Sequence, residues 1–340
     1  MGVTVALDGQ GVERGADALR AGVEAVIAEG IGIRLFGDPA ALPECDGAEV
    51  VPASDRISND EEPVAAVRRR TDASVVRAAA DVAEGGADAL VSAGPTGATM
   101  TAALFAMKRI RGVRRPALAL QLAVPGRDGP PTLLLDVGAN TEARSQDLVQ
   151  FGVLGAAFSR AVLGVAAPRV ALLSVGEESK KGTPIVIEAH EELAGLDGVD
   201  FIGNVEGRDL LGAVADVIVT DGFTGNVALK TLEGTAKAVG AAVSDAARSN
   251  PLAVVGGLLL RPALGGLRRE MDPDTTGGAI LLGLRGIAVV AHGSSGPDGI
   301  ANAIRLAART VSERAVDRTA ELLASAGATR GDLAPDKKTS

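Results

Sequence analysis

Residues 88–100 read DALVSAGPTGATM, an apolar run that passes through a short glycine-bearing loop into a second apolar run. The first run, Ala89-Leu90-Val91, predicts a buried strand, and the stretch from residue 98 onward predicts a helix. Backbone N–H groups at the start of a helix suit an anion. When such strand–loop–helix units repeat along a chain, they indicate an α/β fold.

The same alternation continues through most of the sequence. Strands are predicted at 3–8, 32–37, 49–53, 88–92, 117–122, 132–137, 169–175, 199–204, 216–220 and 286–291, and helices at 64–84, 98–110, 145–163, 184–195, 225–247, 277–284 and 298–325. Most of the strand runs are continuously apolar, which is typical of strands covered on both faces. We therefore predict a three-layer α/β/α, doubly wound, mostly parallel sheet.

The domain boundaries follow from the same pattern. We expect a single α/β domain over residues 1–325 with a protruding apolar helical segment at about 245–270, and a disordered tail at 326–340. The chain of 340 residues is 46% hydrophobic, enough for a sizeable core. Its net charge of −9 argues against a nucleic-acid partner. The single cysteine, Cys45, excludes an intrachain disulfide and favours a cytoplasmic location.

Polar, glycine-bearing segments follow many of the predicted strands. They lie at 8–9, 92–94, 136–140, 176–178, 204–209, 221–226 and 292–295. In an open parallel sheet these loops would all emerge along one edge, where ligands bind. The sequence has no nucleophile elbow, no phosphate-binding fingerprint of the nucleotide-binding folds and no His/Cys spacing for a metal. We therefore predict direct transfer to a bound anion, without metal or cofactor.

The loop side chains supply the candidate site. We take as catalytic candidates Lys181, Asn226, Asp221, His292 and Asn140. The candidates for binding substrate or phosphate are Ser92, Gly94, Thr96, Gly97, Asp8, Glu206, Arg208, Lys230 and Ser294. His292 closes an apolar run and opens a polar loop, which suits a general acid or a phosphate ligand; the alternative is that it braces the loop.

Eight motifs carry a family resemblance. They are the stretch 53–78 with Asn59-Asp60-Glu61-Glu62-Pro63, followed by SAGPTGA, LLLDVGAN, VGEESKKG, GNVEGRD, ADVIVTDGFTGNVALKTLEG, TTGGAILLG and AHGSS. In this order, over roughly residues 50–310, the chain resembles the phosphate acyltransferases of bacterial phospholipid synthesis. The resemblance implies a fold similar to phosphotransacetylases and isopropylmalate-dehydrogenase-like proteins.

The resemblance also implies an activity and partners. Family members convert acyl-[acyl-carrier-protein] and inorganic phosphate to acyl phosphate, and this product feeds a membrane glycerol-3-phosphate acyltransferase. They form homodimers and bind the inner membrane face peripherally. Carried to this chain, phosphate sits on the 92–97 loop near Lys181, and Asn140 and Asn226 donate to the oxyanion. Asp221 orients phosphate or a lysine, and His292 protonates the leaving thiolate.

Three positions depart from the family pattern. The first loop reads Asp8-Gly9-Gln10-Gly11, where the family usually has Asp and an Ala-Met-Gly-Gly-Asp loop. Pro95 replaces the usual Asn, and Thr183 replaces another Asn. These changes leave two alternatives open: a phosphotransacetylase-like enzyme that uses acyl-coenzyme A, and a divergent, inactive acyl- or phosphate-binding paralogue.

Two further segments point to partners. The apolar stretch 251–267 has an uninterrupted apolar part only from Leu252 to Leu260, followed by Arg261, Arg268 and Arg269, and this part is too short to span a bilayer. It suits a membrane-dipping tip, a dimer interface or a lid over the acyl chain. The basic residues Arg68, Arg69, Arg70, Arg111, Arg114 and Arg115 are candidates for docking an acidic carrier protein, the alternative being ordinary surface charge.

Overall fold

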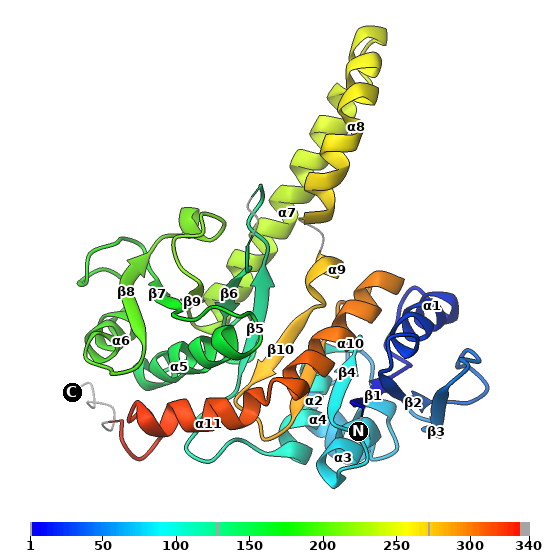
Figure 1. Ribbon diagram of the computed structural model, residues 1–340, viewed down its shortest axis with the longest axis horizontal. Coiled ribbons are helices and arrows are strands. Elements are labelled where there is room, and N and C mark those ends of the chain that lie inside the picture. Colours follow the sequence, from blue (N-terminus) through cyan, green and yellow to red (C-terminus); the bar gives the residue numbers. More distant parts are fainter. Residues whose placement is uncertain (1, 127–128, 271–272, 334–340) are drawn as a thin grey trace.

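The computed structural model describes residues 2–126, 129–270 and 273–333 (Figure 1). Within these residues eleven strands form one sheet, in the order β3-β2-β1-β4-β11-β10-β5-β6-β9-β7-β8. The strands are β1 (Thr4–Asp8), β2 (Gly32–Gly37), β3 (Ala48–Pro52), β4 (Ala89–Ser92), β5 (Ala117–Leu122), β6 (Thr132–Leu135), β7 (Arg169–Leu173), β8 (Asp200–Val205), β9 (Val217–Val219), β10 (Ala279–Leu282) and β11 (Ile287–Val290). The predicted mostly parallel α/β sheet is confirmed.

The sheet consists of two parallel blocks that run in opposite directions. Strands β3, β2, β1, β4 and β11 are mutually parallel, and so are β6, β9, β7 and β8. Three antiparallel pairs in the centre, β11–β10, β10–β5 and β5–β6, reverse the direction. The prediction that all the polar loops emerge along one edge is therefore wrong. The loops after β1, β4 and β11 lie at one edge, and those after β6 to β9 point the other way.

The β5–β6 pair makes this reversal, because β5 is antiparallel to β10 and therefore runs in the same direction as β11. Strand β10 differs from the sequence-based expectation, which placed it in a helix at 277–284. Its four apolar residues are too few to show a periodicity. Gly277, Gly278 and Gly283, which flank it, all have positive φ angles of 82°, 87° and 95°. Such a backbone does not continue a right-handed helix, so the segment is held extended between its two neighbours.

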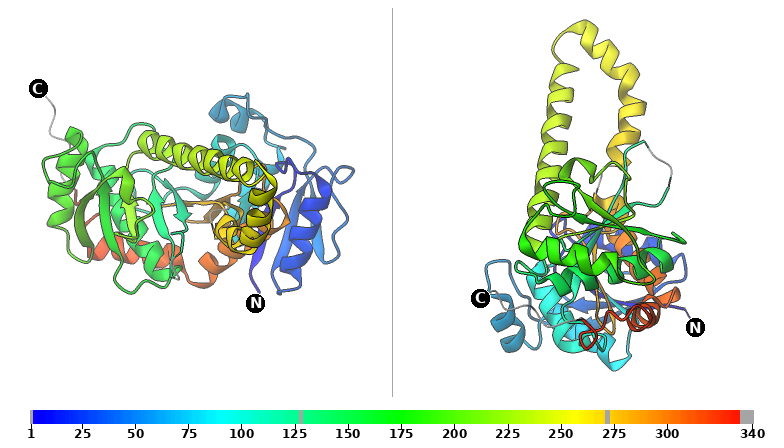
Figure 2. Two further views of the ribbon diagram at one scale, coloured as in Figure 1. Left: turned by 90° about the horizontal axis from the view of Figure 1, so that it is seen from above. Right: turned by 90° about the vertical axis from the view of Figure 1, so that its left-hand side faces the viewer.

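Helices cover both faces of the sheet (Figures 1 and 2). One core contains residues of α1 (Ala16–Ile27), α5 (Ser145–Ala161), α6 (Pro184–Ala194), α10 (Pro297–Ser312) and α11 (Ala315–Ser325). The other contains residues of α2 (Pro63–Arg69), α3 (Ser74–Glu84) and α4 (Thr96–Met107) and the first turns of α7 (Gly222–Ala246). Strand residues alternate between the two cores: Leu7 and Val91 belong to the first, Ala6 and Leu90 to the second. This alternation makes the three layers.

A long helical hairpin projects from the body. It comprises α7, 25 residues long, and α8 (Pro251–Glu270) (Figure 2). The short helix α9 (Pro273–Thr276) leads back into the sheet, and a single turn of 3-10 helix spans Gly207–Asp209. Leu252, Leu258 and Leu259 near the tip are 83%, 61% and 78% exposed. Among the described residues no helix is long and apolar enough to cross a membrane.

The C-terminal segment is ordered further than the sequence predicts. Ala328 is fully buried, and its carbonyl accepts a hydrogen bond of 2.8 Å from the Gln150 side chain. The Arg330 N–H donates to the Gly112 carbonyl at 2.7 Å. The disordered tail expected from residue 326 therefore does not begin there, and its remainder, 334–340, lies outside the described residues.

Candidate functional site

A buried carboxylate fastens the ends of two neighbouring strands. Asp8, at the end of β1, accepts hydrogen bonds from the hydroxyls of Ser74 at 2.6 Å and Ser92 at 2.8 Å. Burial raises the pKa of Asp8, and these two hydrogen bonds act in the opposite direction. Since Ser92 is fully buried and committed to Asp8, the two predicted phosphate ligands instead fix the loop that follows β4.

The 92–97 loop opens helix α4 without a side-chain cap. Pro95 is the N-cap residue, and its carbonyl accepts the Thr99 N–H at 2.9 Å. The Gly94 N–H donates to the Ser92 hydroxyl at 3.0 Å, so this predicted phosphate donor is already used. The N–H groups of the first helical turn, Thr96 to Ala98, have no side-chain partner, which leaves the positive end of α4 open.

These groups border a cleft of about 810 Å³. One wall is apolar and runs along β5 through Leu118, Leu120 and Leu122, which share one face of the strand. Leu229 and Leu232 of α7 also line it. The polar rim contains Asp8, Glu13, Arg56, Ser58, Asn59, Ser74, Thr96, Asn226, Lys230, Glu233 and His292. The cleft therefore joins a long apolar surface to a rim of charged and hydrogen-bonding groups.

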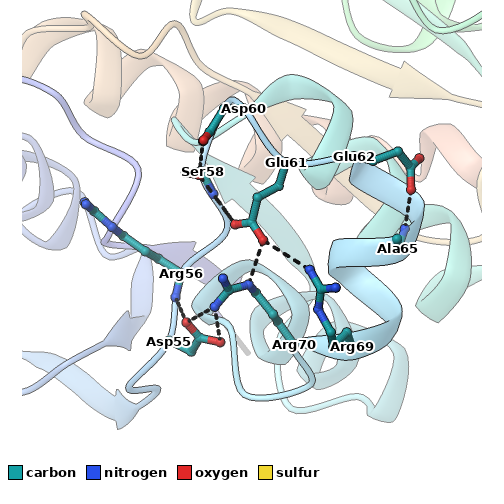
Figure 3. Close-up of polar contacts among 9 residues, drawn as sticks. All are labelled: Asp55, Arg56, Ser58, Asp60, Glu61, Glu62, Ala65, Arg69 and Arg70. Atoms are coloured by element: carbon teal, nitrogen blue, oxygen red, sulfur yellow. Dashed lines mark hydrogen bonds and ion pairs between the residues drawn. The ribbon is translucent and has the colours of Figure 1, made fainter.

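Residues 56–59 form one lip of this cleft, and a network of ion pairs holds the segment 55–61 that contains them (Figure 3). The Arg70 guanidinium contacts both oxygens of Asp55, at 2.9 and 3.0 Å, and also Glu61 at 2.9 Å. The Arg56 side chain points away from this network, and its guanidinium has no ion pair among the described residues (Figure 3). Arg56 is thus a cation presented to the cleft, which the sequence analysis missed.

Helix α7 brings two predicted residues to the cleft, Asn226 and Lys230. Lys230 pairs with Glu233 at 2.8 Å, one turn further along the helix. A Cβ atom added at Gly225 would lie 1.9 Å from the Asp136 carbonyl oxygen, so only glycine allows the helix to approach the loop after β6 this closely. This approach places Asn226 beside Gly138 on the wall of the cleft.

His292 and Ser294 form a pair after β11. The Ser294 N–H donates to Nδ1 of His292 at 3.2 Å, and the Ser294 hydroxyl lies 2.7 Å from the same nitrogen. A ring nitrogen that accepts a backbone N–H is unprotonated, so the neutral imidazole carries its proton on Nε2. Because His292 lines the cleft and Ser294 does not, Ser294 orients the ring.

Asn140 and Asp221 lie outside the cleft. Asn140 donates its amide hydrogens to the Pro116 carbonyl and to Asp136, both at 2.8 Å, so it has none left for an oxyanion. It braces the loop after β6, in which burial raises the pKa of Asp136. Asp221 caps α7 and accepts the Thr224 N–H at 2.9 Å.

Lys181, Glu206 and Arg208 also lie away from the cleft, on the loops after β7 and β8. The Arg208 guanidinium is 3.1 Å from both Glu206 and Glu177. These strands belong to the reversed block of the sheet, which contributes to the cleft through the loop after β6, Leu211 and helix α7 but not through these three side chains. Of the predicted residues, the structure brings together Asp8, Gly94, Thr96, Gly97, Asn226, Lys230 and His292.

The sequence analysis missed Glu13 and Glu233 as well as Arg56. Arg56 follows a predicted strand, and that position was the signal available for it. Glu233 lies in the middle of α7, and nothing in its sequence context indicated a place at the cleft. Among the described residues no group of three or more His, Cys, Asp or Glu side chains could hold a metal ion.

Comparison with known proteins gives consistent results. The model of a family described as "Fatty acid synthesis protein" matches residues 3–318. A phosphate acyltransferase of Elusimicrobium minutum is 48% identical over 271 residues, 79% of this chain and 78% of that protein. A phosphate acyltransferase of Bacillus subtilis is 44% identical over 302 residues, 87% of this chain and 90% of that protein.

Solved structures share the fold. A phosphotransacetylase from Streptococcus pyogenes superposes with a TM-score of 0.61 at 18% identity, over 92% of this chain and 94% of that one. The EutD phosphotransacetylase from Staphylococcus aureus gives a TM-score of 0.58 at 18% identity, over 91% and 94%. The expected likeness to the phosphotransacetylase fold is confirmed.

Proposed function

The chain belongs to the fatty acid synthesis protein family, whose matching relatives are phosphate acyltransferases, and we propose that it transfers an acyl group from acyl-[acyl-carrier-protein] to inorganic phosphate. As an acyltransferase it needs a place for an acyl chain and a place for the acceptor. The cleft supports both. An acyl chain would lie along the wall of Leu118, Leu120 and Leu122, and an anion would bind at the polar rim.

The observation that carries this proposal is that the uncapped start of α4 and the Arg56 side chain line one and the same cleft. Phosphate would accept hydrogen bonds from the N–H groups of Thr96 and Gly97, where the helix end favours negative charge. Arg56 would supply the compensating positive charge. Asp8 and Ser92 act beneath this point, since they hold the loop in place.

The proposed reaction is a direct displacement. A phosphate oxygen attacks the thioester carbonyl carbon, and the carbonyl oxygen takes up the negative charge of the tetrahedral intermediate. The Asn226 amide, which has no hydrogen-bond partner among the described residues, is the candidate donor to that oxygen. Nε2–H of His292 can donate a hydrogen bond that stabilises the leaving thiolate, and the proton of the attacking hydrogen phosphate passes to the sulfur. The C–S bond breaks, and acyl phosphate and the free thiol remain.

A phosphorolysis assay tests the proposal. The purified chain is incubated with phosphate and with acyl groups on carrier protein, on coenzyme A or on N-acetylcysteamine, and acyl phosphate is trapped as the hydroxamate. We expect the highest kcat/KM with the carrier-protein donor. Preference for coenzyme A would establish the phosphotransacetylase-like alternative. A lack of product with every donor would establish the inactive paralogue.

We also propose that the α7–α8 hairpin serves a membrane surface or a dimer, because its tip exposes Leu252, Leu258 and Leu259. Contact with the inner face of the cell membrane would bring the product to a membrane glycerol-3-phosphate acyltransferase. Leu258→Glu should abolish co-sedimentation with anionic vesicles if the tip enters lipid. It should instead yield monomers in sedimentation velocity if the tip is a homodimer interface. Arg309→Glu on α10 is the control for added negative charge.

A further inference from the structure

A second pocket, of about 510 Å³, lies at the far end of helix α4 from the cleft. It is lined by the last turn of α4, residues 108–113, Arg285 in the turn between β10 and β11, and Arg330 of the C-terminal segment. Five of its lining residues are cations and none is a carboxylate: Lys108, Arg109, Arg111, Arg285 and Arg330. Figure 1 shows α2 and α4 at the end of the body remote from the α7–α8 hairpin.

The positive charge of this pocket is uncompensated. All five cations are exposed, and within the part of the chain that the structure describes none of them forms an ion pair. Where their side chains are held, they donate to backbone carbonyls: Arg285 to Arg109 at 3.0 Å, and Arg109 to Arg114. In a chain of net charge −9, five cations around one hollow with no ion pair among the described residues give a local positive potential that would attract an anionic surface.

The structure also separates this cluster from the other basic residues that the sequence suggested. Arg69 and Arg70 pair with Glu61, and Arg114 and Arg115 pair with Asp147. Their positive charge is therefore compensated by carboxylates of the same chain. Arg111, in contrast, lines the basic pocket with no partner, and Arg68 stacks over the Phe105 ring at 5.4 Å beside it.

An apolar stripe on α4 connects the basic pocket with the cleft. Met100 lines the cleft, and Leu104, four residues later and therefore on the same helix face, lines the pocket. Both side chains are half-buried, as is Phe105. The open start of α4 at Thr96 and its end at Met107 are about 17 Å apart, at about 1.5 Å per residue. A flexible arm of this length could link a partner at the pocket to the reacting centre.

We propose that the basic pocket docks the acidic protein that carries the acyl donor, with the arm of that donor lying along Met100 and Leu104 into the cleft. This inference rests on the proposed function, because it requires a donor attached to a protein. Charge complementarity recognises the protein, and the apolar stripe recognises the arm. A free phosphorylated ligand would use the cations but would gain nothing from the stripe.

The test uses the double variant Arg111→Glu/Arg330→Glu, since neither side chain makes a hydrogen bond within the described protein. Lys180→Glu/Arg309→Glu, which reverses two exposed cations away from the pocket, is the matched control. For each protein kcat/KM is measured with the carrier-protein donor and with the N-acetylcysteamine thioester, which has no protein and no charge. The Kd of the fluorescently labelled carrier protein is measured by anisotropy at low and high salt.

We expect the pocket variant to lose at least tenfold in kcat/KM for the carrier-protein donor and to keep its activity with N-acetylcysteamine. Its Kd for the carrier protein should rise equally and lose its salt dependence. Equal losses on both donors, an unchanged carrier Kd, or the same loss in the control would overturn the docking site. If the wild type turns over small thioesters and binds no carrier protein, the carrier-protein donor of the proposed function fails, and the docking site fails with it. If the carrier binds with wild-type affinity and no donor reacts, the proposed function fails while the Kd comparison still decides the docking site.

Discussion

The Asp8 carboxylate at the end of β1 accepts a 2.8 Å hydrogen bond from the Ser92 hydroxyl at the end of β4. The two residues are 84 positions apart in the sequence and directly opposite each other in the parallel pair. Ser92 in turn accepts the Gly94 N–H at 3.0 Å. A buried carboxylate thereby sets the backbone of the loop that opens α4.

This relationship predicts a pH-dependent effect of Asp8→Asn. Burial raises the folded-state pKa of Asp8 above its usual 3.8, so ionised Asp8 costs folding free energy. This destabilisation by ionised Asp8 is fully present above the pKa of the folded state and is absent below the pKa of the unfolded state. The free energy of unfolding of the wild type, relative to Asp8→Asn, should therefore rise as pH falls through the folded pKa towards 3.8. Urea unfolding between pH 4 and 8 measures it, and a pH-independent difference would contradict it.

Pro95 predicts how the start of α4 treats an anion. Pro95→Asp would place a capping carboxylate against the free N–H groups of α4 and repel phosphate, while Pro95→Asn would offer a neutral side chain of the same shape. We expect the KM for phosphate to be about tenfold higher in the Asp variant than in the Asn variant, equivalent to about 1.4 kcal/mol. Steady-state kinetics at constant acyl donor give both values. Equal KM values in the two variants would place phosphate elsewhere in the cleft.

Gly225 predicts a strong packing effect. Gly225→Ala would drive a methyl group into the Asp136 carbonyl, force α7 away from the β6 loop and displace Asn226. We expect a loss of stability of about 1–3 kcal/mol or more, together with a fall in kcat. Gly234→Ala in the same helix meets no atom within 4 Å and should instead stabilise by about 0.5–1 kcal/mol. Thermal and urea unfolding of the two variants measure the change in stability. Similar changes at both positions would contradict the close contact of α7 with the Asp136 carbonyl.

His292 and Ser294 predict a division of roles. His292→Ala should lower kcat by about 10²–10⁴-fold if the Nε2–H stabilises the departing thiolate as the sulfur takes up its proton. Ser294→Ala leaves the backbone N–H of residue 294 on Nδ1, so we expect a much smaller effect. A donor with a more acidic thiol leaves without protonation, so it should rescue His292→Ala selectively. An absence of such rescue would assign His292 to loop bracing.

Much of the fold could be predicted because it depends on local patterns. Continuous apolar runs identified ten of the strands, since strands buried on both faces read that way in any order of the sheet. The strand–loop–helix unit at 88–100 also predicted that Ser92 ends a strand and that Thr96 and Gly97 lie where the next helix begins. Strand β10 was not predictable in this way, because AILL fits a helix and a strand equally well.

The site was predicted less well, because the sequence does not reveal that β5 and β6 are antiparallel. In a fully parallel sheet Lys181, Glu206 and Arg208 would share an edge with His292. In the structure the block of β6 to β9 is reversed relative to β11, and these three side chains do not line the cleft. Asn140 does not offer an oxyanion donor for another reason. Its amide hydrogens bond to the Pro116 carbonyl and to Asp136, and no linear motif reveals these contacts.

The sequence by itself determined the α/β class, the family and the loop that opens α4, because each depends on residues that are neighbours in the chain. Only the tertiary structure decided which loops meet. It also decided that Arg70 pairs with Asp55 while Arg56 forms no ion pair with the described residues, and that the start of α4 at Pro95 has no side-chain cap. Those properties depend on the direction of paired strands and on hydrogen bonds between distant residues. The proposed anion site is therefore a local feature of residues 92–97, but the residues that support its loop, Asp8 and Ser74, come from elsewhere in the chain.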